Sequence, residues 1–437
     1  MSLPKYPEYV DAGPYWLHSV PAHWRVVPNK AVLCPRNDVV GSNSGDFLLL
    51  SLTLSGVIPR DIDSGKGKFP AEFDTYKIVS PNDLIFCLFD LDETPRTVGL
   101  ASHHGMITGA YDVFECAKTA DPRFLNYFYL HIDAFKGLRP FYTGLRKVVR
   151  PPTFMSVKFA LPPTVEQNAI CSFLDRETAK IDALVQEQQH LIDLLKEKRQ
   201  AVISHAVTKG LNPDAPMKDS GVEWLGKIPA HWKLKRLKHI SPFIAVGIVV
   251  NPSAFVADDG LPFIYGGDIR EGVIDWENSR RIDAKSSQEN SKTTLRAGDL
   301  LTVRVGAPGI TAVVPSECEG GNCASVMLIR QGSFNSSWLC YAMNTRIIRF
   351  QVEIVQYGAA QEQFNISHAV NFWAPLPLRA EQDAIAEFLV RETAKLDDLI
   401  SEATRAIDLL QERRTALISA AVTGKIDVRG LATKDAA

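Results

Sequence analysis

Two polar loops carry the side chains of this sequence that are best suited to reading DNA bases. Each loop begins with a Tyr: residues 142–147 read Tyr-Thr-Gly-Leu-Arg-Lys, and residues 357–363 read Tyr-Gly-Ala-Ala-Gln-Glu-Gln. Arg and Lys hydrogen-bond to guanine edges, Gln hydrogen-bonds to adenine edges, and Tyr contacts phosphates. The expected DNA contacts in and next to these loops are Tyr142, Arg146, Lys147, Arg150, Tyr357, Gln361 and Gln363. For each residue the competing interpretation is a solvated surface loop.

Further basic residues lie where they would meet a nucleic acid. Arg96, in Asp-Glu-Thr-Pro-Arg-Thr-Val-Gly, and Arg304, in Val-Arg-Val-Gly-Ala-Pro-Gly, are expected on hairpin tips. A basic cluster predicts phosphate contacts, with an exposed face as the alternative: Lys233, Lys235, Arg236 and Lys238. The net charge of −2 excludes a strongly cationic coat, so partners are expected to supply part of the charge that phosphates require. Segments 1–165 and 217–380 are nearly balanced, with 17 basic against 16 acidic residues and 17 against 15.

The motifs of enzymes that modify or cut DNA are absent from the sequence. An amino-methyltransferase needs Asn or Asp followed by Pro-Pro and an aromatic residue, and neither residues 251–254 (Asn-Pro-Ser-Ala) nor residues 150–153 (Arg-Pro-Pro-Thr) fit. Residues 64–68 lack the Gly-x4-Gly-Lys-Ser/Thr pattern of a phosphate loop. Neither a nuclease cluster of carboxylates with Lys nor a hydrolase motif is visible. We therefore expect a non-catalytic protein that binds and scaffolds.

The seven cysteines are too scattered to predict a disulfide framework or a four-ligand zinc site, and no metal is expected. Cys318 and Cys323 lie close together, but no second Cys or His pair stands near them at ligand spacing. No run of about 18 apolar residues occurs, and the N-terminus lacks the basic and then apolar segments of a signal peptide. The expected location is the cytoplasm, with reduced thiols and no membrane contact.

The chain of 437 residues is long enough for two or more domains. The segments that must position these residues occur twice in it, as an internal repeat. Residues 166–208 align without gaps to residues 381–423, an offset of 215, with 26 of 43 positions identical. At the head of each copy, the sequence Pro-Ala-His-Trp ends at Trp24 and again at Trp232. Between these matched ends the two bodies diverge almost completely. A duplicated frame with two unlike inserts indicates one mechanical task performed on two different targets.

Each repeat ends in a segment that predicts a long helix. Residues 164–209 contain neither Pro nor Gly, whereas Pro162 and Pro163 precede them and Gly210 follows. Apolar residues recur at spacings of seven and three, as the seam of a coiled coil requires. The predicted seam consists of Leu174, Ile181, Leu184, Leu191, Leu195, Val202, Leu389, Leu396, Leu399, Leu410 and Leu417, with Gln188 and Ala403 as weaker positions. The alternative is two amphipathic helices that each cover their own domain.

Both bodies are predicted to be rich in β-structure, because short apolar runs alternate with Gly, Pro, Asn and Asp. The expected strands are residues 47–51, 84–89 and 111–115 in the first body and 262–265, 300–305 and 325–330 in the second. Residues 124–132 and 337–350 are each expected to form a helix. The predicted fold class is α+β, in which two mixed β-rich modules alternate with two long helices that pair as an antiparallel coiled coil about a pseudo-twofold axis.

Phrases in the repeated parts resemble the specificity subunits of type I restriction-modification systems. They include Met-Lys-Asp-Ser-Gly-Val-Glu-Trp-Leu-Gly-Lys-Ile-Pro at residues 217–229 and the tail sequences Arg-Glu-Thr-Ala-Lys-Ile-Asp and Ala-Val-Ile-Ser-His-Ala-Val-Thr. The resemblance covers nearly the whole chain and its order of two copies. It implies target-recognition domains over 1–163 and 211–378, conserved helical regions over 164–210 and 379–426, and a C-terminal tail over 427–437.

The family's role implies that each recognition domain reads one half of a split DNA target and that the coiled coil sets the spacer. The implied partners are double-stranded DNA, two methyltransferase subunits, and restriction subunits that translocate DNA. S-adenosylmethionine, ATP and magnesium would act on those subunits, so no cofactor is expected on this chain. The alternatives are the specificity subunit of a methylation-only system, a coiled-coil adaptor whose bodies bind proteins, and a free-standing enzyme.

Overall fold

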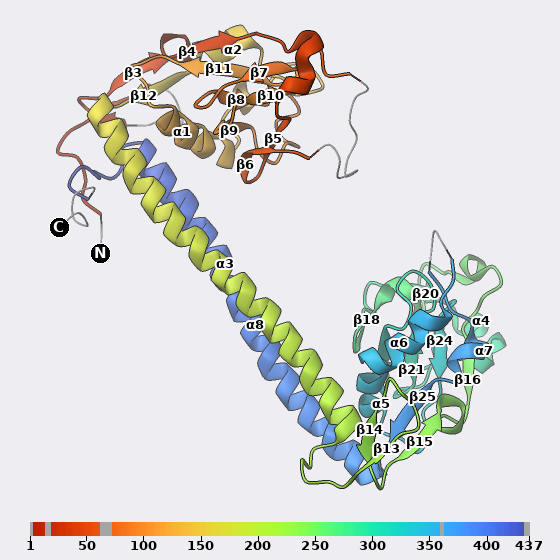
Figure 1. Ribbon diagram of the computed structural model, residues 1–437. Coiled ribbons are helices and arrows are strands. Elements are labelled where there is room, and N and C mark those ends of the chain that lie inside the picture. The colour runs from red at the N-terminus through yellow and green to blue at the C-terminus, as the bar shows by residue number, and fades with distance from the viewer. Residues whose placement is uncertain (1–2, 14–18, 62–71, 359–361, 432–437) are drawn as a thin grey trace. The chain divides into compact units, whose positions relative to one another are not determined.

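The structure is a computed structural model that describes residues 3–13, 19–61, 72–358 and 362–431. The chain divides into two compact units: unit 1 is Met1–Gln189 with Arg405–Ala437, and unit 2 is His190–Thr404. The long helices α3 (Thr164–Lys209) and α8 (Arg379–Val422) are each divided between the two units. Each unit therefore consists of one body of strands and short helices together with a part of each long helix (Figure 1).

The body of unit 1 is built on a four-stranded antiparallel sheet with the order β4-β11-β8-β9. These strands are β4 (Leu33–Arg36), β8 (Leu84–Phe86), β9 (Val98–Leu100) and β11 (Asp112–Cys116). Further antiparallel pairs are β1 (Tyr9–Asp11) with β2 (Ser19–Pro21), β3 (Arg25–Pro28) with β12 (Lys158–Leu161), β5 (Leu50–Thr53) with β6 (Gly56–Pro59), and β7 (Lys77–Val79) with β10 (Gly105–Ile107). Helices α1 (Pro122–Ala134) and α2 (Pro151–Ser156) complete the body.

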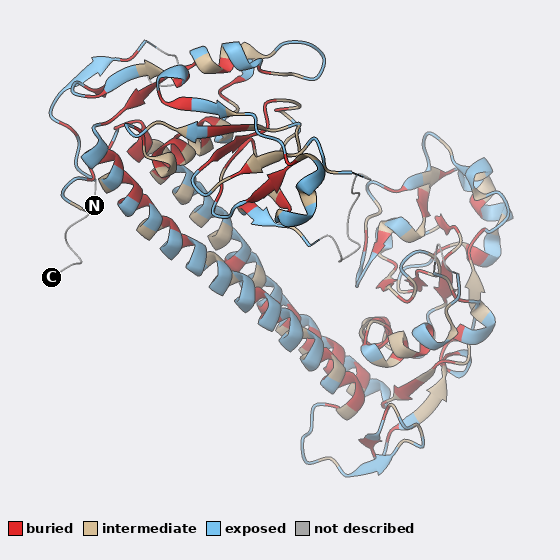
Figure 2. Ribbon diagram, turned by 45° about the horizontal axis from the view of Figure 1, so that its top comes forward, coloured by how far each residue is buried: buried red, intermediate tan, exposed pale blue. Residues whose placement is uncertain are grey.

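Aromatic side chains form the core of this body. Phe86 and Phe114 come from the sheet, Tyr129 comes from α1 and Phe154 comes from α2, and all four are buried. Buried segments run through the strands and short helices of the body (Figure 2). The ring centroid of Phe86 lies 4.8 Å from those of Tyr129 and Phe154 and 5.7 Å from that of Phe114. Because each aromatic ring buries a large apolar area, this cluster fixes both helices on the sheet.

The body of unit 2 has a sheet of the same topology, β16-β24-β21-β22. These strands are β16 (Ile244–Val246), β21 (Leu300–Thr302), β22 (Thr311–Val313) and β24 (Met327–Ile329). β17 (Leu261–Ile264) pairs antiparallel with β20 (Arg280–Ile282) and parallel with β23 (Asn322–Cys323). The other pairs are β13 (Met217–Asp219) with β14 (Lys227–Pro229), β15 (Lys233–Arg236) with β25 (Trp373–Leu376), and β18 (Ile269–Arg270) with β19 (Val273–Ile274). The helices are α4 (Ala284–Glu289), α5 (Ser336–Met343), α6 (Arg346–Val355) and α7 (Ile366–Ala369).

The expected mixture of strands and helices is confirmed, although the strand predicted over 47–51 is β5 at Leu50–Thr53 and the strand predicted over 84–89 ends at Phe86. One helix in unit 2 also differs. The single helix predicted over 337–350 is divided into α5 and α6. The division occurs at Asn344, whose side-chain amide accepts a hydrogen bond from the Thr311 amide (3.0 Å) and donates one to the Thr311 carbonyl (2.8 Å). Asn344 thus binds the backbone of β22, and the helix ends there.

The predicted seam along α3 and α8 is buried only in part. Leu174, Ile181, Leu195, Leu389 and Leu396 are buried, and Val202, Leu410 and Leu417 are partly buried. Leu184, Leu191 and Leu399, by contrast, are 44%, 42% and 48% exposed and do not fit the seam. After Ile181 the next buried residue of α3 is Ile192, eleven residues later. An ordinary α-helix drifts by about 20° per heptad from a strict seven-residue repeat, so a step of eleven keeps residues on one face more closely.

The two long helices contact each other within each unit. In unit 1, Leu174 of α3 shares a core with Val422 of α8, and Arg414 Nε donates to Asp182 Oδ1 at 3.1 Å. In unit 2, Ile203 of α3 shares a core with Leu389 of α8, and Arg199 Nε donates to Asp397 Oδ1 at 2.9 Å. The two ion pairs occupy equivalent positions under the 215-residue offset of the repeat.

Candidate nucleic-acid interface

The segment 139–150, which contains the first candidate loop (residues 142–147), is held against the loop that follows β8. The Asp90 amide donates to the Arg146 carbonyl at 2.8 Å, and the Val149 amide donates to the Leu88 carbonyl at 2.9 Å. Although Asp90 and Arg146 are 56 residues apart in sequence, these backbone bonds join the two loops into one surface.

Carboxylates from the loop after β8 hold three basic side chains of this surface. Arg146 donates to Asp90 from Nε (3.3 Å) and from Nη2 (2.5 Å). Asp92 pairs with Lys147 Nζ at 2.9 Å and accepts from Arg139 Nε at 3.1 Å. The hydrogen bond from Arg146 holds the pKa of Asp90 below its usual value, and those from Lys147 and Arg139 do the same for Asp92. The cluster is therefore ionised at neutral pH.

Tyr142 lies beside this cluster, with its hydroxyl directed at Asp92 Oδ1 (3.4 Å). Burial, together with the nearby carboxylate, raises the pKa of Tyr142 to about 12, so its hydroxyl stays protonated. Three of the predicted DNA contacts, Tyr142, Arg146 and Lys147, are thus brought together on unit 1.

The other two candidates of unit 1 lie in different settings. Arg96 is partly buried in the connection between β8 and β9, and its Nη2 donates to the Leu54 carbonyl at 2.8 Å. Burial lowers the pKa of Arg96, and the side chain lines a cavity beside His131 and Arg414. Arg96 is therefore packed against its own unit and does not stand free at a hairpin tip. Arg150 is exposed immediately before α2.

In unit 2 the second candidate loop is closed by Tyr357 and Gln363, whose amides donate to each other's carbonyls at 2.9 Å. The Gly306 amide holds the loop by donating to the Glu362 carbonyl at 2.9 Å. Tyr357 and Glu362 are exposed and Gln363 is partly buried. Gln361, the remaining candidate of this loop, lies outside the described residues.

Two of the basic residues predicted in unit 2 have partners within the unit. Arg304 is partly buried, and its Nε donates to the Ser325 carbonyl at 3.3 Å. Arg236 donates to Asn371 Oδ1 at 3.0 Å and lies 4.8 Å from the centre of the Trp373 ring. The lysines of the same cluster are more open: Lys233 and Lys238 are exposed and Lys235 is partly buried. Arg236 therefore stabilises the β15–β25 pair, and the lysines are the residues left for phosphate contact.

Each body is attached to the start of a long helix through a buried Gln. In unit 1, Gln167 of α3 accepts a hydrogen bond from the Asp121 amide at 2.7 Å. In unit 2, Gln382 of α8 accepts one from the Asn335 amide at 2.8 Å. Asp121 and Asn335 are the N-cap residues of α1 and α5, so each Gln binds a short helix of its body at the same point.

A Glu at the head of each long helix binds the Pro-Ala-His-Trp sequence of the same unit. His23 Nε2 lies 2.8 Å from Glu166 Oε2, and His231 Nε2 lies 3.0 Å from Glu381 Oε2. Glu166 also accepts a hydrogen bond of 2.9 Å from the Trp24 indole. The two parts of the sequence that are duplicated therefore contact each other in both units.

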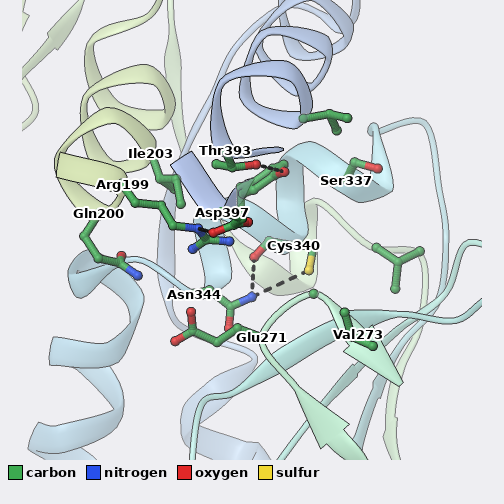
Figure 3. Close-up of a pocket in the computed structure, with 14 residues that line it drawn as sticks. Arg199, Gln200, Ile203, Glu271, Val273, Ser337, Cys340, Asn344, Thr393 and Asp397 are labelled. Carbon is green, nitrogen blue, oxygen red and sulfur yellow. Dashed lines mark hydrogen bonds and ion pairs between the residues drawn. The ribbon is translucent and has the colours of Figure 1, made fainter. Parts of the chain in front are cut away.

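A cavity of about 320 Å³ lies in unit 2 where α3, α5 and α8 meet (Figure 3). The Arg199–Asp397 ion pair forms part of its wall, and Asn344 donates to the Cys340 carbonyl at 3.0 Å. Burial raises the pKa of the Cys340 thiol to about 12, so it is protonated and a weak nucleophile at neutral pH. The cavity lies at the junction of the body with the helices, away from the candidate loop.

Within the ranges that the structure describes, no group of three or more His, Cys, Asp or Glu side chains is placed to hold a metal ion. Cys318 and Cys323 are buried, and burial raises their pKa values to about 11 and about 12. Over the same described residues, no helix combines the length and apolar character needed to cross a membrane.

Sequence reasoning missed the acidic half of the unit 1 surface. Asp90 and Asp92 hold Arg146 and Lys147, and Arg146 also lies over the Phe89 ring, 5.1 Å from its centroid. The prediction named only the basic residues. The available signal was Phe-Asp-Leu-Asp-Glu directly after a buried strand, at residues 89–93. Without the pairing between two loops distant in sequence, that signal does not identify its partners.

The fold and its polar loops define a duplicated protein of two bodies, each joined to parts of the same two long helices. Comparisons with known proteins make this class more specific. The chain is 25% identical over 288 residues to the type I restriction enzyme EcoBI specificity subunit of Escherichia coli, covering 63% of this chain and 59% of that protein. It is 26% identical over 156 residues to the EcoKI specificity subunit of Escherichia coli strain K12, covering 36% and 32%. No protein-family model matches the chain.

Solved structures share the fold. A chain from a structure on complex assembly and conformational transition of the type I restriction-modification system superposes with a TM-score of 0.64 at 18% identity, covering 92% of this chain and 98% of that one. The HsdS subunit from Thermoanaerobacter tengcongensis superposes with a TM-score of 0.52 at 17% identity, covering 95% and 100%. The resemblance to type I specificity subunits is thus confirmed. The chain spans 59% and 32% of the lengths of the two curated relatives.

Proposed function

We propose that this chain is the non-catalytic DNA-recognition subunit of a type I restriction-modification enzyme. Residues 1–163 read one half of a bipartite target, and residues 211–378 read the other half. The helical regions 164–210 and 379–426 pair as an antiparallel coiled coil and fix the spacer between the half-sites.

The observation that carries this proposal is the duplicated attachment of the bodies to the long helices. Gln167 and Gln382 bind their short helices through the same hydrogen bond, and the His–Glu contact is also repeated. The bodies differ in the polar side chains that they present. Unit 1 has an ionised cluster around Arg146, whereas the loop of unit 2 exposes Tyr357 and Glu362. A repeated frame with two different polar surfaces suits a protein that recognises two different half-sites.

The long helices account for a fixed spacer. With 46 and 44 residues, α3 and α8 are about 65 to 70 Å long. Duplex DNA presents the same face about every 34 to 36 Å, so a rigid pair of this length corresponds to about two turns. Arg199–Asp397 in unit 2 and Arg414–Asp182 in unit 1 join the two helices at equivalent positions of the repeat, which supports their antiparallel pairing.

Exposed apolar residues on both helices support the docking of two methyltransferase subunits. Five leucines are between 42% and 55% exposed: Leu184, Leu191, Leu194, Leu399 and Leu409. Burying such side chains against a partner is favourable at about 25 cal/mol per Å² of apolar surface. The methyltransferases would bring S-adenosylmethionine for adenine methylation, and restriction subunits would bring ATP and magnesium.

The charge of the chain predicts that DNA binding depends on these partners. With a net charge of −2, the chain alone gains little from the release of counterions by phosphates. We therefore expect weak DNA binding by the isolated chain and tight binding by its complex with the methyltransferase.

Footprinting of the reconstituted complex tests the function. The expected result is two protected segments separated by a spacer of fixed length. Replacing Arg146 and Lys147 together by Gln is expected to weaken protection of one half-site. One continuous footprint without dependence on spacer length would contradict the proposal. Unchanged DNA binding by the double variant, together with binding of a protein by either body, would favour the adaptor interpretation.

A further inference from the structure

The guanidinium of Arg146 is open to solvent and yet fixed in orientation. Its side chain is 69% exposed, but Asp90 binds both Nε and Nη2. The Phe89 ring lies beneath the guanidinium, with its centroid 5.1 Å from Cζ, and Phe89 is itself stacked on Tyr111 at 6.0 Å. An exposed Arg held on two sides loses little conformational freedom when a ligand binds.

The contact with Asp90 leaves one edge of the guanidinium available. Nε and Nη2 lie on the edge that faces the carboxylate, and each donates one N–H to it. The adjacent edge consists of Nη1 and the second N–H of Nη2, and no partner is assigned to Nη1 in the described part of the chain. That edge presents two parallel donors, which match the O6 and N7 acceptors that guanine shows in the major groove.

The backbone around Arg146 indicates that the Asp90 carboxylate is required. Asp90 adopts a left-handed conformation with φ of 48°, which Asp tolerates better than most residues but which still favours Gly. At the equivalent junction of unit 2, the residue that donates to the second loop is Gly306, with φ of 89°. The Gly306 amide binds the Glu362 carbonyl as the Asp90 amide binds the Arg146 carbonyl. Gly would suit this position in unit 1, so the strained Asp indicates a role for its side chain.

We propose that Arg146 recognises a guanine in the half-site of the first recognition domain. Nη1 and Nη2 donate to O6 and N7, and Asp90 and Phe89 position the guanidinium. This inference rests on the proposed function. Arg146 determines specificity, Asp90 is a positioning residue, and Lys147, held by Asp92, contributes positive charge without selecting a base.

A base analogue tests the contact in the complex of this chain with its methyltransferase subunits. Each guanine of the first half-site is replaced in turn by 7-deazaguanine, which keeps its base pair but lacks the N7 acceptor. For the wild-type complex, one of these replacements is expected to weaken binding about 5- to 20-fold, as loss of one part of a bidentate contact predicts. For Arg146→Ala, the same replacement is expected to change binding less than about 2-fold, because the donor is already missing.

Two further variants separate positioning from charge. Asp90→Asn keeps the size of the side chain but weakens its hold on Arg146, so the penalty of the analogue is expected to fall to between those of wild type and Arg146→Ala. Lys147→Ala removes a neighbouring charge, so it is expected to weaken binding of all duplexes alike and to leave the analogue penalty unchanged. A purely structural role of Asp90 would weaken binding without altering the penalty.

The outcomes distinguish this inference from the function on which it rests. A wild-type complex that binds no bipartite site contradicts the proposed function itself. A complex that binds such a site but shows the same analogue penalties in wild type and Arg146→Ala overturns the inference alone. If Arg146→Ala does not assemble, an unchanged penalty in Asp90→Asn overturns it.

Discussion

Replacing Gln167 by Leu measures how much the attachment of a body to the long helices contributes to stability. Gln167 is fully buried, and its Oε1 accepts from the Asp121 amide at 2.7 Å. Its Nε2 donates to the carbonyls of Thr119 (3.1 Å) and Pro162 (2.8 Å). Because Leu is similar in size, the substitution removes three hydrogen bonds without opening a large cavity.

The expected loss follows from the number of backbone groups left without a partner. Each such group costs about 1 to 3 kcal/mol where it is buried and less where water reaches it, as at the exposed Thr119, and the apolar Leu offsets part of the cost. The free energy of unfolding of unit 1 is therefore expected to fall by about 3 to 4 kcal/mol. The matched variant Gln382→Leu loses two hydrogen bonds, to the Asn335 amide (2.8 Å) and the Pro377 carbonyl (3.0 Å). Its cost in unit 2 is expected to be about 1 kcal/mol smaller.

Calorimetric melting of the full chain provides the assay. For units of this size, 1 kcal/mol corresponds to a shift of about 2 to 4 °C in Tm. Gln167→Leu is thus expected to lower the melting temperature of unit 1 by about 6 to 16 °C, and Gln382→Leu that of unit 2 by about 4 to 12 °C. Gln186→Leu, at an exposed position of α3, serves as the control and is expected to shift Tm by less than about 2 °C.

Two results would refute this reasoning. The first is a shift for Gln167→Leu no larger than that of the exposed control. The second is a larger shift for Gln382→Leu than for Gln167→Leu, because the loss would then not follow the number of hydrogen bonds.

Burial, with Lys425 adding to the effect, lowers the pKa of His131 from 6.5 to about 4. Below pH 6.5 the imidazole is therefore protonated in the unfolded chain but not in the folded one, and this difference favours unfolding. Unit 1 should lose about 2 kcal/mol between pH 7.5 and 5 in urea titrations, and His131→Leu should abolish the difference; equal stabilities of the wild type would contradict this. By the same titration, Leu389→Ala at a fully buried position should cost about 2 to 5 kcal/mol, and a loss below 1 would contradict its role in the core. Four residues inserted at the same level of both α3 and α8 would lengthen the pair of helices by about 6 Å. The spacer in the methylated DNA motif should then grow by about two base pairs. An unchanged motif in methylation sequencing would count against a spacer set by helix length.

The elements whose ends are set by local chemistry could be predicted from the sequence. α3 starts directly after Pro163 and ends before Gly210, whose φ is +77°. β8 and β21 start where expected. Each follows a turn that contains a left-handed residue, Asn82 in one and Gly298 in the other, and an Asp stands between that residue and the strand. Turns and helix ends of this kind depend on neighbours along the chain, so their signals are readable without the fold.

The features set by distant contacts could not be predicted. The exposure of Leu184 and Leu399 depends on the angle at which two helices face each other. The end of α5 depends on Asn344 binding a strand 33 residues earlier in the chain. The carboxylates that hold Arg146 and Lys147 come from a loop more than 50 residues earlier, so the sequence indicated the charged residues of the surface but not their arrangement.

The division of the chain also determines the order in which it can fold during synthesis. Unit 2 is one uninterrupted stretch, whereas unit 1 combines residues from both ends, and the Tyr9 hydroxyl donates to the Gly424 carbonyl across 415 residues. On the ribosome, the first body to emerge must therefore wait for the last helix, while the second body is complete earlier. Until then Leu174 lacks its partners from α8, so nascent chains halted before residue 405 would expose this apolar surface to chaperones or proteases.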